Sequence, residues 1–298
     1  TAVGDAALEN STTASNNVAV GQAGLAQNTT GTSNTALGTY SLNVATTADN
    51  NTAVGRSAGL AVTTGSDNTI VGTFAGEDLT TGQQNTFLGY LAGANMTGGS
   101  NSTFIGRRAG YSTNSDNNIA IGRSAFEDAT SAATNNVVIG NTSGFRIQGD
   151  ENTAVGNSTL EDCTSGNQNT AIGYQALKEL NTGTQNVAIG SFSLRDVTSG
   201  IENTALGDDA GVEVSTGSNN TLLGNRAGRT GSPSGQITTG SNNVVLGDNS
   251  VSNLFCADTS ISSSDSRDKT DVSDFTIGLD WIKALRPVTY RWDRRTWY

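Results

Sequence analysis

Few side chains in this sequence have the type and spacing that catalysis requires. The 298 residues include no histidine, which excludes an imidazole base and a histidine-ligated metal. Two acidic pairs, Glu161-Asp162 and Asp208-Asp209, could supply the paired carboxylates of a glycosidase. Each pair consists of adjacent residues in a polar loop, so we expect a solvated surface at both places and no catalytic role.

The cysteines and the polar turns do not point to a metal site either. Cys163 and Cys256 are far apart in sequence and no CxxC motif is present, so neither a disulfide framework nor a zinc site is implied. We expect two free or partly buried thiols. Turns rich in Asn and Asp could hold Ca²⁺, but the GGxGxD nonapeptide of calcium-binding β-rolls is missing. The sequence therefore predicts no metal and no cofactor.

Composition narrows the class of protein further. The formal net charge is −11, with 37 Gly, 2 Pro, 34% hydrophobic and 6% aromatic residues. An acidic chain argues against a nucleic-acid partner. No run approaches the roughly 18 apolar residues of a membrane helix, so membrane insertion is not expected. Neither a signal peptide nor an initiator Met is visible, and we expect that Thr1 is not the natural start.

A repeat of 17 residues organises most of the chain. One glycine ends each word of the type Asn-Thr-Ala-Val-Gly, and we call it the repeat glycine. The steps between copies are 17 six times, then 16, 18 and 16, then 17 four times, and finally 23, where the extra residues fall around Arg229–Gln236. The fifteen repeat glycines are residues 4, 21, 38, 55, 72, 89, 106, 122, 140, 156, 173, 190, 207, 224 and 247.

The residues around the repeat glycine predict one coil of a parallel β-solenoid per repeat. The residue directly before it is Val, Ile or Leu in all fifteen copies, and the residue three before it is always β-branched. β-Branched residues favour an extended backbone, and glycine can end the strand with a positive φ. The residue four before is Asn in thirteen of fourteen copies, which suits a stacked hydrogen-bonded ladder. We predict an all-β β-roll of about fifteen 17-residue coils.

The strand word also indicates how the coils are covered. Successive side chains of a strand point to opposite faces, and both faces of this word are apolar or nearly so. A 17-residue coil encloses little volume, so only one face can point into its own lumen. We therefore infer that the coils pack against other copies of the chain. The alternative is a wide, flat solenoid that folds on itself.

The words Asn51–Gly55 and Asn186–Gly190 resemble the Asn-Ser-Val-Ala-Ile-Gly coils of YadA-type trimeric adhesin heads, and similar coils occur in phage fibre proteins. The family coil is shorter, so the resemblance is to the word, over about residues 1–250. It implies a left-handed β-roll with three chains to a head. With strands about 4.8 Å apart, fourteen steps would give a rod of roughly 65–70 Å.

Composition changes near residue 264. Residues 264–298 contain seven basic and six acidic residues and all three Trp. We predict a β-roll over 1–250, a linker over 251–263 and a separate segment over 264–298. In that segment a helix is expected from about Ser273 to Arg286, before Pro287, and a strand over 288–292. Thirty-five residues cannot form a stable core alone, so either more chain follows or the segment folds on a partner.

This segment resembles the start of the C-terminal intramolecular chaperone domain of phage tail spikes and fibres, of the endosialidase type. The residues that carry the resemblance are Ser264, Asp265, Arg267, Lys269, Ile282, Leu285, Pro287, Tyr290 and Trp292. The resemblance implies a domain that helps three chains assemble and then cuts its own backbone at Ser264–Asp265. Ser264 would be the nucleophile and Lys269 its activating base, a pairing that a desolvated lysine permits. Asp268 departs from the family, which often has an apolar residue there.

The leading hypothesis is a structural protein: the shaft of a homotrimeric phage tail fibre, extracellular on the virion, that attaches to a host receptor or glycan. The alternatives are a bacterial surface adhesin of the trimeric autotransporter kind and a polysaccharide depolymerase on a β-solenoid. We expect no activity on an external substrate beyond a possible single-turnover self-cleavage. The basic pair Arg107-Arg108 is interpreted as exposed. A cluster of aromatic residues is expected to fill the core or pack in the trimer: Phe74, Phe87, Tyr90, Phe104 and Tyr111.

Overall fold

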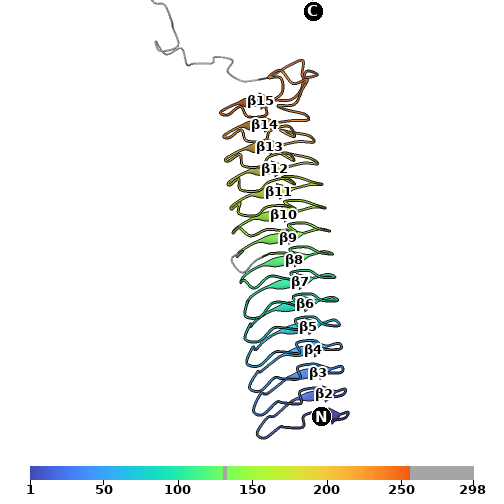
Figure 1. Ribbon diagram of the computed structural model, residues 1–298. Coiled ribbons are helices and arrows are strands. Elements are labelled where there is room, and N and C mark those ends of the chain that lie inside the picture. The colour runs from blue at the N-terminus through green and yellow to red at the C-terminus, as the bar shows by residue number, and fades with distance from the viewer. Residues whose placement is uncertain (130–132, 256–298) are drawn as a thin grey trace, which may run out of the picture. The chain divides into compact units, whose positions relative to one another are not determined.

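Each repeat winds once and adds one strand to a single sheet (Figure 1). The computed structural model describes residues 1–129 and 133–255. Within them no helix occurs and the fifteen strands follow one another in the sheet in chain order, every neighbouring pair parallel, which confirms the predicted parallel β-solenoid. The strands are β1 (Ala2–Val3), β2 (Val18–Val20), β3 (Thr35–Leu37), β4 (Thr52–Val54), β5 (Thr69–Val71), β6 (Thr86–Leu88), β7 (Thr103–Ile105), β8 (Ile119–Ile121), β9 (Val137–Ile139), β10 (Thr153–Val155), β11 (Thr170–Ile172), β12 (Val187–Ile189), β13 (Thr204–Leu206), β14 (Thr221–Leu223) and β15 (Val244–Leu246).

The chain divides into two units, Thr1–Ser252 and Asn253–Tyr298, and the solenoid is the first. The helix predicted over 273–286, the strand predicted over 288–292 and Cys256 lie outside the described residues. The predicted boundaries at residues 250 and 263 therefore stay predictions.

The register between strands equals one repeat throughout. In the pair β4–β5, Thr52 lies opposite Thr69, Ala53 opposite Ile70 and Val54 opposite Val71. The irregular steps of 16 and 18 residues leave the register intact from β7 to β10, so the length differences are absorbed in the turns. Turn backbones also bond to the next coil, and many donor–acceptor separations there are 16 or 17 residues. Each coil is thus held by its neighbour around most of the winding.

The repeat glycine is required by a close approach between coils. Gly72 has a φ of +141°, and a Cβ placed on it would lie 2.3 Å from the carbonyl oxygen of Gly89. That distance is far inside van der Waals contact, and the φ is one that residues with a side chain rarely adopt. A larger residue would push neighbouring coils apart.

The asparagine four residues before the repeat glycine forms the expected ladder through the coils. The backbone N–H of Asn51 donates to Oδ1 of Asn34 at 2.9 Å, and its own Oδ1 accepts the N–H of Asn68 at 3.0 Å. Its amide nitrogen donates to the carbonyl of Gly65 at 2.9 Å. These asparagines are buried, and the ladder satisfies polar groups that would otherwise be costly inside a protein. Ser102 replaces Asn once, and its hydroxyl accepts the N–H of Asn118 at 3.2 Å.

Two positions of each coil point into the same part of the lumen, and a large residue at one of them goes with a small residue at the other. Where the residue two before the repeat glycine is larger than alanine, the residue four after it is glycine in every coil but the last, as with Phe104 and Gly110. Where the first is alanine, the second is in most coils a buried leucine or phenylalanine, as with Ala154 and Leu160. A Cβ on Gly110 would lie 2.4 Å from the Phe104 ring. Close packing of the interior leaves no room for both.

Where both of these positions are small in one coil, side chains of the neighbouring coils fill the space. In the coil with Ala53 and Gly59, a Cβ on Gly59 would lie 3.0 Å from Cδ1 of Ile70 and 3.0 Å from Cδ2 of Leu42. The lumen is therefore filled by side chains from the coils above and below. The position four after the repeat glycine has a left-handed backbone in both classes, with φ of +60° at Gly59 and +49° at Leu160.

Candidate functional site

The strands present one apolar column to the lumen and a second column to the outside. Ala53, Ile70 and Phe87 lie in the lumen and are fully buried, whereas the residues directly before the repeat glycines point the other way. We call the latter the outer apolar column. Its fifteen members are Val3, Val20, Leu37, Val54, Val71, Leu88, Ile105, Ile121, Ile139, Val155, Ile172, Ile189, Leu206, Leu223 and Leu246.

The outer apolar column is not covered within the described part of this chain. Leu88 is 46% exposed, Leu206 51% and Leu246 43%. Parallel sheets normally have both faces covered, and a long exposed apolar patch marks a surface that contacts another molecule. The other face of the strands packs in the lumen, whereas this column faces outward, where another molecule could cover it.

The predicted aromatic cluster divides between the lumen and the surface. Phe87 and Phe104 are buried and stacked, with ring centroids 5.3 Å apart and planes 6° apart, so these two fill the core as predicted. Phe74 and Tyr111 are half-buried and Tyr90 is 46% exposed. The last three rings lie on turns that follow the strands, outside the lumen.

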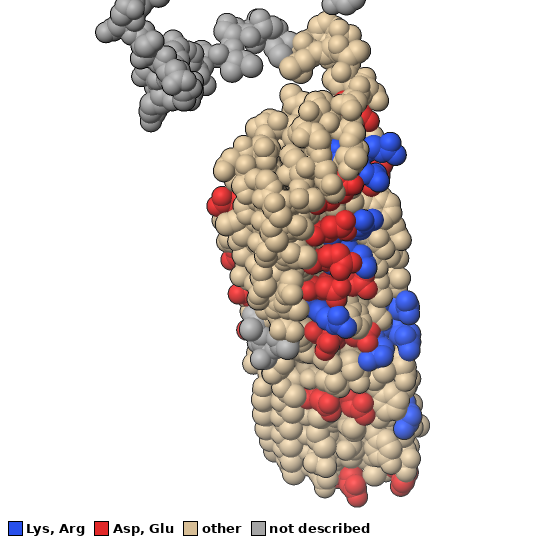
Figure 2. Space-filling view, turned by 45° about the horizontal axis from the view of Figure 1, so that its top comes forward, with Lys and Arg blue, Asp and Glu red and all other residues tan. Residues whose placement is uncertain are grey.

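Charged side chains gather in a band along the shaft (Figure 2). Many occupy the positions five and six after the repeat glycine, and we call these two positions the charged ridge. Its basic members are neutralised locally, because Lys178 pairs with Glu179 at 3.0 Å and Arg195 with Asp196 at 2.7 Å. The hydrogen bond to Glu179 raises the pKa of Lys178. The charged members of the ridge are Glu9, Glu77, Asp78, Glu127, Asp128, Arg146, Glu161, Asp162, Lys178, Glu179, Arg195, Asp196, Glu213 and Arg229.

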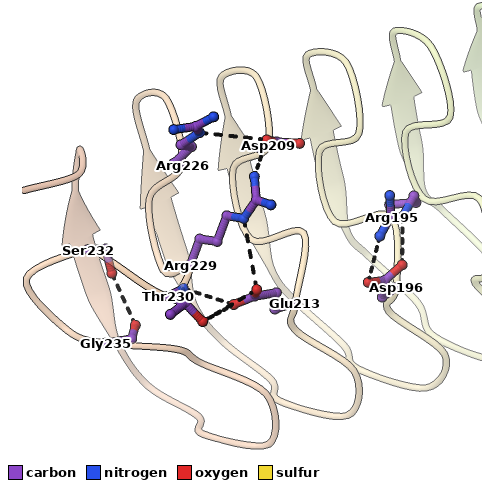
Figure 3. Close-up of polar contacts among 9 residues, drawn as sticks. All are labelled: Arg195, Asp196, Asp209, Glu213, Arg226, Arg229, Thr230, Ser232 and Gly235. Carbon is purple, nitrogen blue, oxygen red and sulfur yellow. Dashed lines mark hydrogen bonds and ion pairs between the residues drawn. The ribbon is translucent and has the colours of Figure 1, made fainter.

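The acidic pairs considered for glycosidase chemistry are engaged in ion pairs. Asp162 accepts from Arg146 at 2.8 Å. Asp209 pairs with both Arg226 and Arg229 (Figure 3). In each pair one carboxylate is thus paired with arginine, but only Asp208 is exposed, and Glu161, Asp162 and Asp209 are half-buried, so the expected solvated surface is found only in part.

The six-residue insertion forms a side loop tied to the preceding coil. The backbone N–H of Thr230 donates to Oε2 of Glu213 at 2.9 Å, and the hydroxyl of Ser232 donates to the carbonyl of Gly235 at 3.0 Å (Figure 3). Ile237 returns to the interior with 6% exposure. The pairing of β14 with β15 is undisturbed, so the insertion decorates the shaft without interrupting the stack.

The basic pair Arg107-Arg108 is not uniformly exposed. Arg107 is exposed, as predicted, but the side chain of Arg108 is only 34% exposed and pairs with the buried carboxylate of Glu127 at 2.8 Å. Its guanidinium also lies 4.4 Å from the centroid of the Tyr111 ring. The prediction was therefore wrong for Arg108, because adjacent residues of a turn point in different directions and a one-dimensional reading cannot separate them.

The free cysteine of the solenoid has a structural role. Cys163 is fully buried, and burial raises the pKa of its thiol to about 11, so it is an inert part of the lumen. Within residues 1–129 and 133–255, no group of three or more potential metal ligands comes together. In that same part of the chain, no helix is long and apolar enough to cross a membrane.

The predicted catalytic residues Ser264, Asp265 and Lys269 lie outside the described residues. No arrangement of these three side chains can be derived from the fold, and their roles rest on the sequence.

A comparison with protein families matches the C-terminal segment. A family model described as "Chaperone of endosialidase" matches residues 264–296, the segment that was separated by composition. No curated protein matches the chain. A β-solenoid that precedes a segment of this family supports a tail-fibre-like protein, and the family suggests trimerisation.

Proposed function

We propose that the chain forms the shaft of a homotrimeric phage tail fibre for host attachment, assembled with the help of its C-terminal segment. One observation carries the proposal: the outer apolar column runs without a polar residue from Val3 to Leu246, and in the single chain eight of its fifteen members are exposed and seven are half-buried. Its members repeat at the strand spacing of about 4.8 Å. A second copy of the same stack offers a surface with that same period along the whole length.

The match to the chaperone family supports three copies rather than two. Burial of the column in a trimer would remove apolar side chains from water at roughly 25 cal/mol per Å². The partner is therefore this chain itself, and the shaft becomes a stiff rod that carries an attachment function at a distance from the particle.

Sedimentation velocity of the full chain tests the assembly. We expect a trimer for the native protein and a shift toward monomer when Leu88→Glu and Leu206→Glu place charges on the outer apolar column. The matched control is Thr81→Glu with Thr216→Glu, at exposed turn positions, which should stay trimeric. A native monomer, or a double Leu variant that stays trimeric, would contradict the proposal.

The proposed self-cleavage is tested separately by intact-mass spectrometry. We propose that the hydroxyl of Ser264 attacks the carbonyl carbon of the Ser264–Asp265 peptide bond while Lys269 accepts the hydroxyl proton and passes it to the departing amino group of Asp265. Water then hydrolyses the ester formed on Ser264, which leaves a free carboxyl there and two separate fragments. Ser264→Ala and Lys269→Met should each leave one uncut mass, whereas Ser266→Ala should be cut like the native chain. An uncut native trimer in which the C-terminal domain is complete would reject cleavage and leave the assembly proposal standing.

A further inference from the structure

Three arginines of the described shaft form no direct ion pair with a carboxylate, and all three lie on one edge. Within the described residues, six of the nine basic side chains form ion pairs. The other three are Arg56, Arg107 and Arg123, which are exposed and occupy the position directly after a repeat glycine. Arg56 acts on the Glu77 carboxylate only through space, without a direct contact. The shared position places the three guanidinium groups on the same side of the solenoid.

Two aromatic rings lie between these arginines on the same edge. Tyr90 directly follows a repeat glycine and Phe74 lies two after one. Arg56 stands over the Phe74 ring, with its Cζ 4.7 Å from the centroid. The Phe74 and Tyr90 rings meet edge to face, 6.4 Å apart, and Tyr90 remains 46% exposed. The rings are thus held in place while one of them stays open to a ligand.

We propose that this edge, formed by Arg56, Phe74, Tyr90, Arg107 and Arg123, binds an acidic polysaccharide. The guanidinium groups would hold carboxylates on the sugar chain, and the tyrosine ring would pack against the apolar face of a pyranose ring. Arginine presents a planar fork of donors that matches a carboxylate. The proposal deepens the attachment role proposed above by giving the chemical class of the receptor, and it depends on that role only for its biological use.

The fold fixes the spacing of these groups before any ligand binds. Arg107 and Arg123 lie in consecutive coils, about 4.8 Å apart along the shaft, and Arg56 lies three coils from Arg107, about 14 Å away. Nε of Arg123 donates to Oδ1 of Asn141 at 2.9 Å, which orients its guanidinium and leaves the terminal nitrogens for a ligand. Such pre-organisation lowers the entropic cost of binding. An extended polymer could therefore lie along the edge and meet several groups at once.

The charge of the rest of the shaft favours a polysaccharide over a nucleic acid. Residues 1–263 contain nine basic and 21 acidic residues, and a surface of this sign repels a polymer with a phosphate at every unit. A polysaccharide with carboxylates on only some sugar units carries less charge for its length. In Figure 2 some basic side chains lie within the acidic band, where they pair with carboxylates, and others lie beside it. A ligand of moderate negative charge could thus use the edge without crossing the band.

Binding of the full chain to immobilised hyaluronate, which has a carboxylate on every second sugar unit, measured by interferometry in low salt, tests this surface. We expect binding that weakens with added salt, and a loss of at least about tenfold in affinity for Arg107→Glu with Arg123→Glu, because each substitution reverses a charge at the ligand. Tyr90→Ala should also weaken binding. The control is Tyr174→Ala, since Tyr174 directly follows a repeat glycine and meets Phe192 edge to face at 5.1 Å but belongs to a different stretch of coils.

The outcomes separate this surface from the assembly function. Failure of native protein to bind hyaluronate, or equal binding by the double arginine variant, would overturn the assignment. So would equal binding to neutral dextran, or tighter binding of single-stranded oligo(dT) through the same arginines, which would indicate a nucleic-acid surface. Sedimentation of each variant reports the trimer independently, so a lost glycan site with an intact trimer leaves the proposed shaft in place.

Discussion

Exchange of volume across the lumen predicts that two substitutions, each harmful alone, will compensate each other. Phe104→Ala empties a fully buried site and should cost about 3–5 kcal/mol. Gly110→Leu should also destabilise the native protein, because a side chain there starts 2.4 Å from the Phe104 ring. Overpacking of this kind costs about 1–3 kcal/mol, and a left-handed leucine adds about 1–2 kcal/mol.

The double variant reproduces the Ala154 and Leu160 arrangement that occurs naturally three coils later. Leucine then fills the space that phenylalanine left, so most of the cavity and overpacking terms disappear. The left-handed strain remains, together with loss of the stacking on Phe87, about 0.5–1.5 kcal/mol. We therefore expect a total near 2–3 kcal/mol, well below the sum of the two single effects, and a coupling of about 3–7 kcal/mol.

Native-state hydrogen exchange followed by mass spectrometry is the appropriate assay, since a repeat array does not unfold in a single step. Peptides over β6–β8 report the local opening free energy of each variant. Gly235→Leu measures the left-handed penalty without packing, since Gly235 has a φ of +69° and nothing within 4 Å of its Cβ position. Additive effects of Phe104→Ala and Gly110→Leu would refute the idea that the two positions share one space.

Two further predictions concern the buried polar and thiol groups. Asn186→Ala should lower the free energy of unfolding by about 1–3 kcal/mol because it leaves buried partners of the asparagine ladder unsatisfied. Ser102→Asn should be neutral or stabilising. An unchanged urea midpoint for Asn186→Ala would contradict a stabilising role of the ladder. Burial raises the pKa of the Cys163 thiol to about 11 in the folded state. The buried neutral thiol therefore contributes fully to stability below about pH 9, and this contribution is lost as pH rises from 9 to 11. In a Cys256→Ser background, rapid labelling of the Cys163 thiol at pH 8 without denaturant would contradict this burial.

The repeat made the fold predictable, and the limits of that prediction are physical. The regular glycine, the β-branched strand word and the asparagine column are local signals, so the sequence alone indicated the sheet and the ladder. The size relation between Phe104 and Gly110 was visible in the sequence only as a mixture of Gly and Leu at the position four after the repeat glycine. Recognising it requires knowing that this position faces the strand across the lumen, which depends on how the turn bends.

The arginine edge was missed for a related reason. Arg107-Arg108 reads as one basic cluster, yet the turn points Arg108 toward Glu127 and leaves Arg107 in solvent. A count of basic residues at the position directly after each repeat glycine would have brought Arg56, Arg107 and Arg123 together. Pairing with acidic residues in other coils could not be read from the sequence in the same way. The chemistry proposed for Ser264 and Lys269 still rests on the sequence of the C-terminal segment.

A comparison within the strands themselves supports an external partner for the outer apolar column. The positions three and one before the repeat glycine lie on the same outward face. At the first, Thr occurs in ten of fifteen copies; at the second, Thr never occurs and Leu occurs five times. Strand propensity favours Thr over Leu, so propensity cannot explain this difference. The lumen cannot explain it either, since neither position points inward. Contact with an identical stack along the outer apolar column would explain why this position is apolar in every coil.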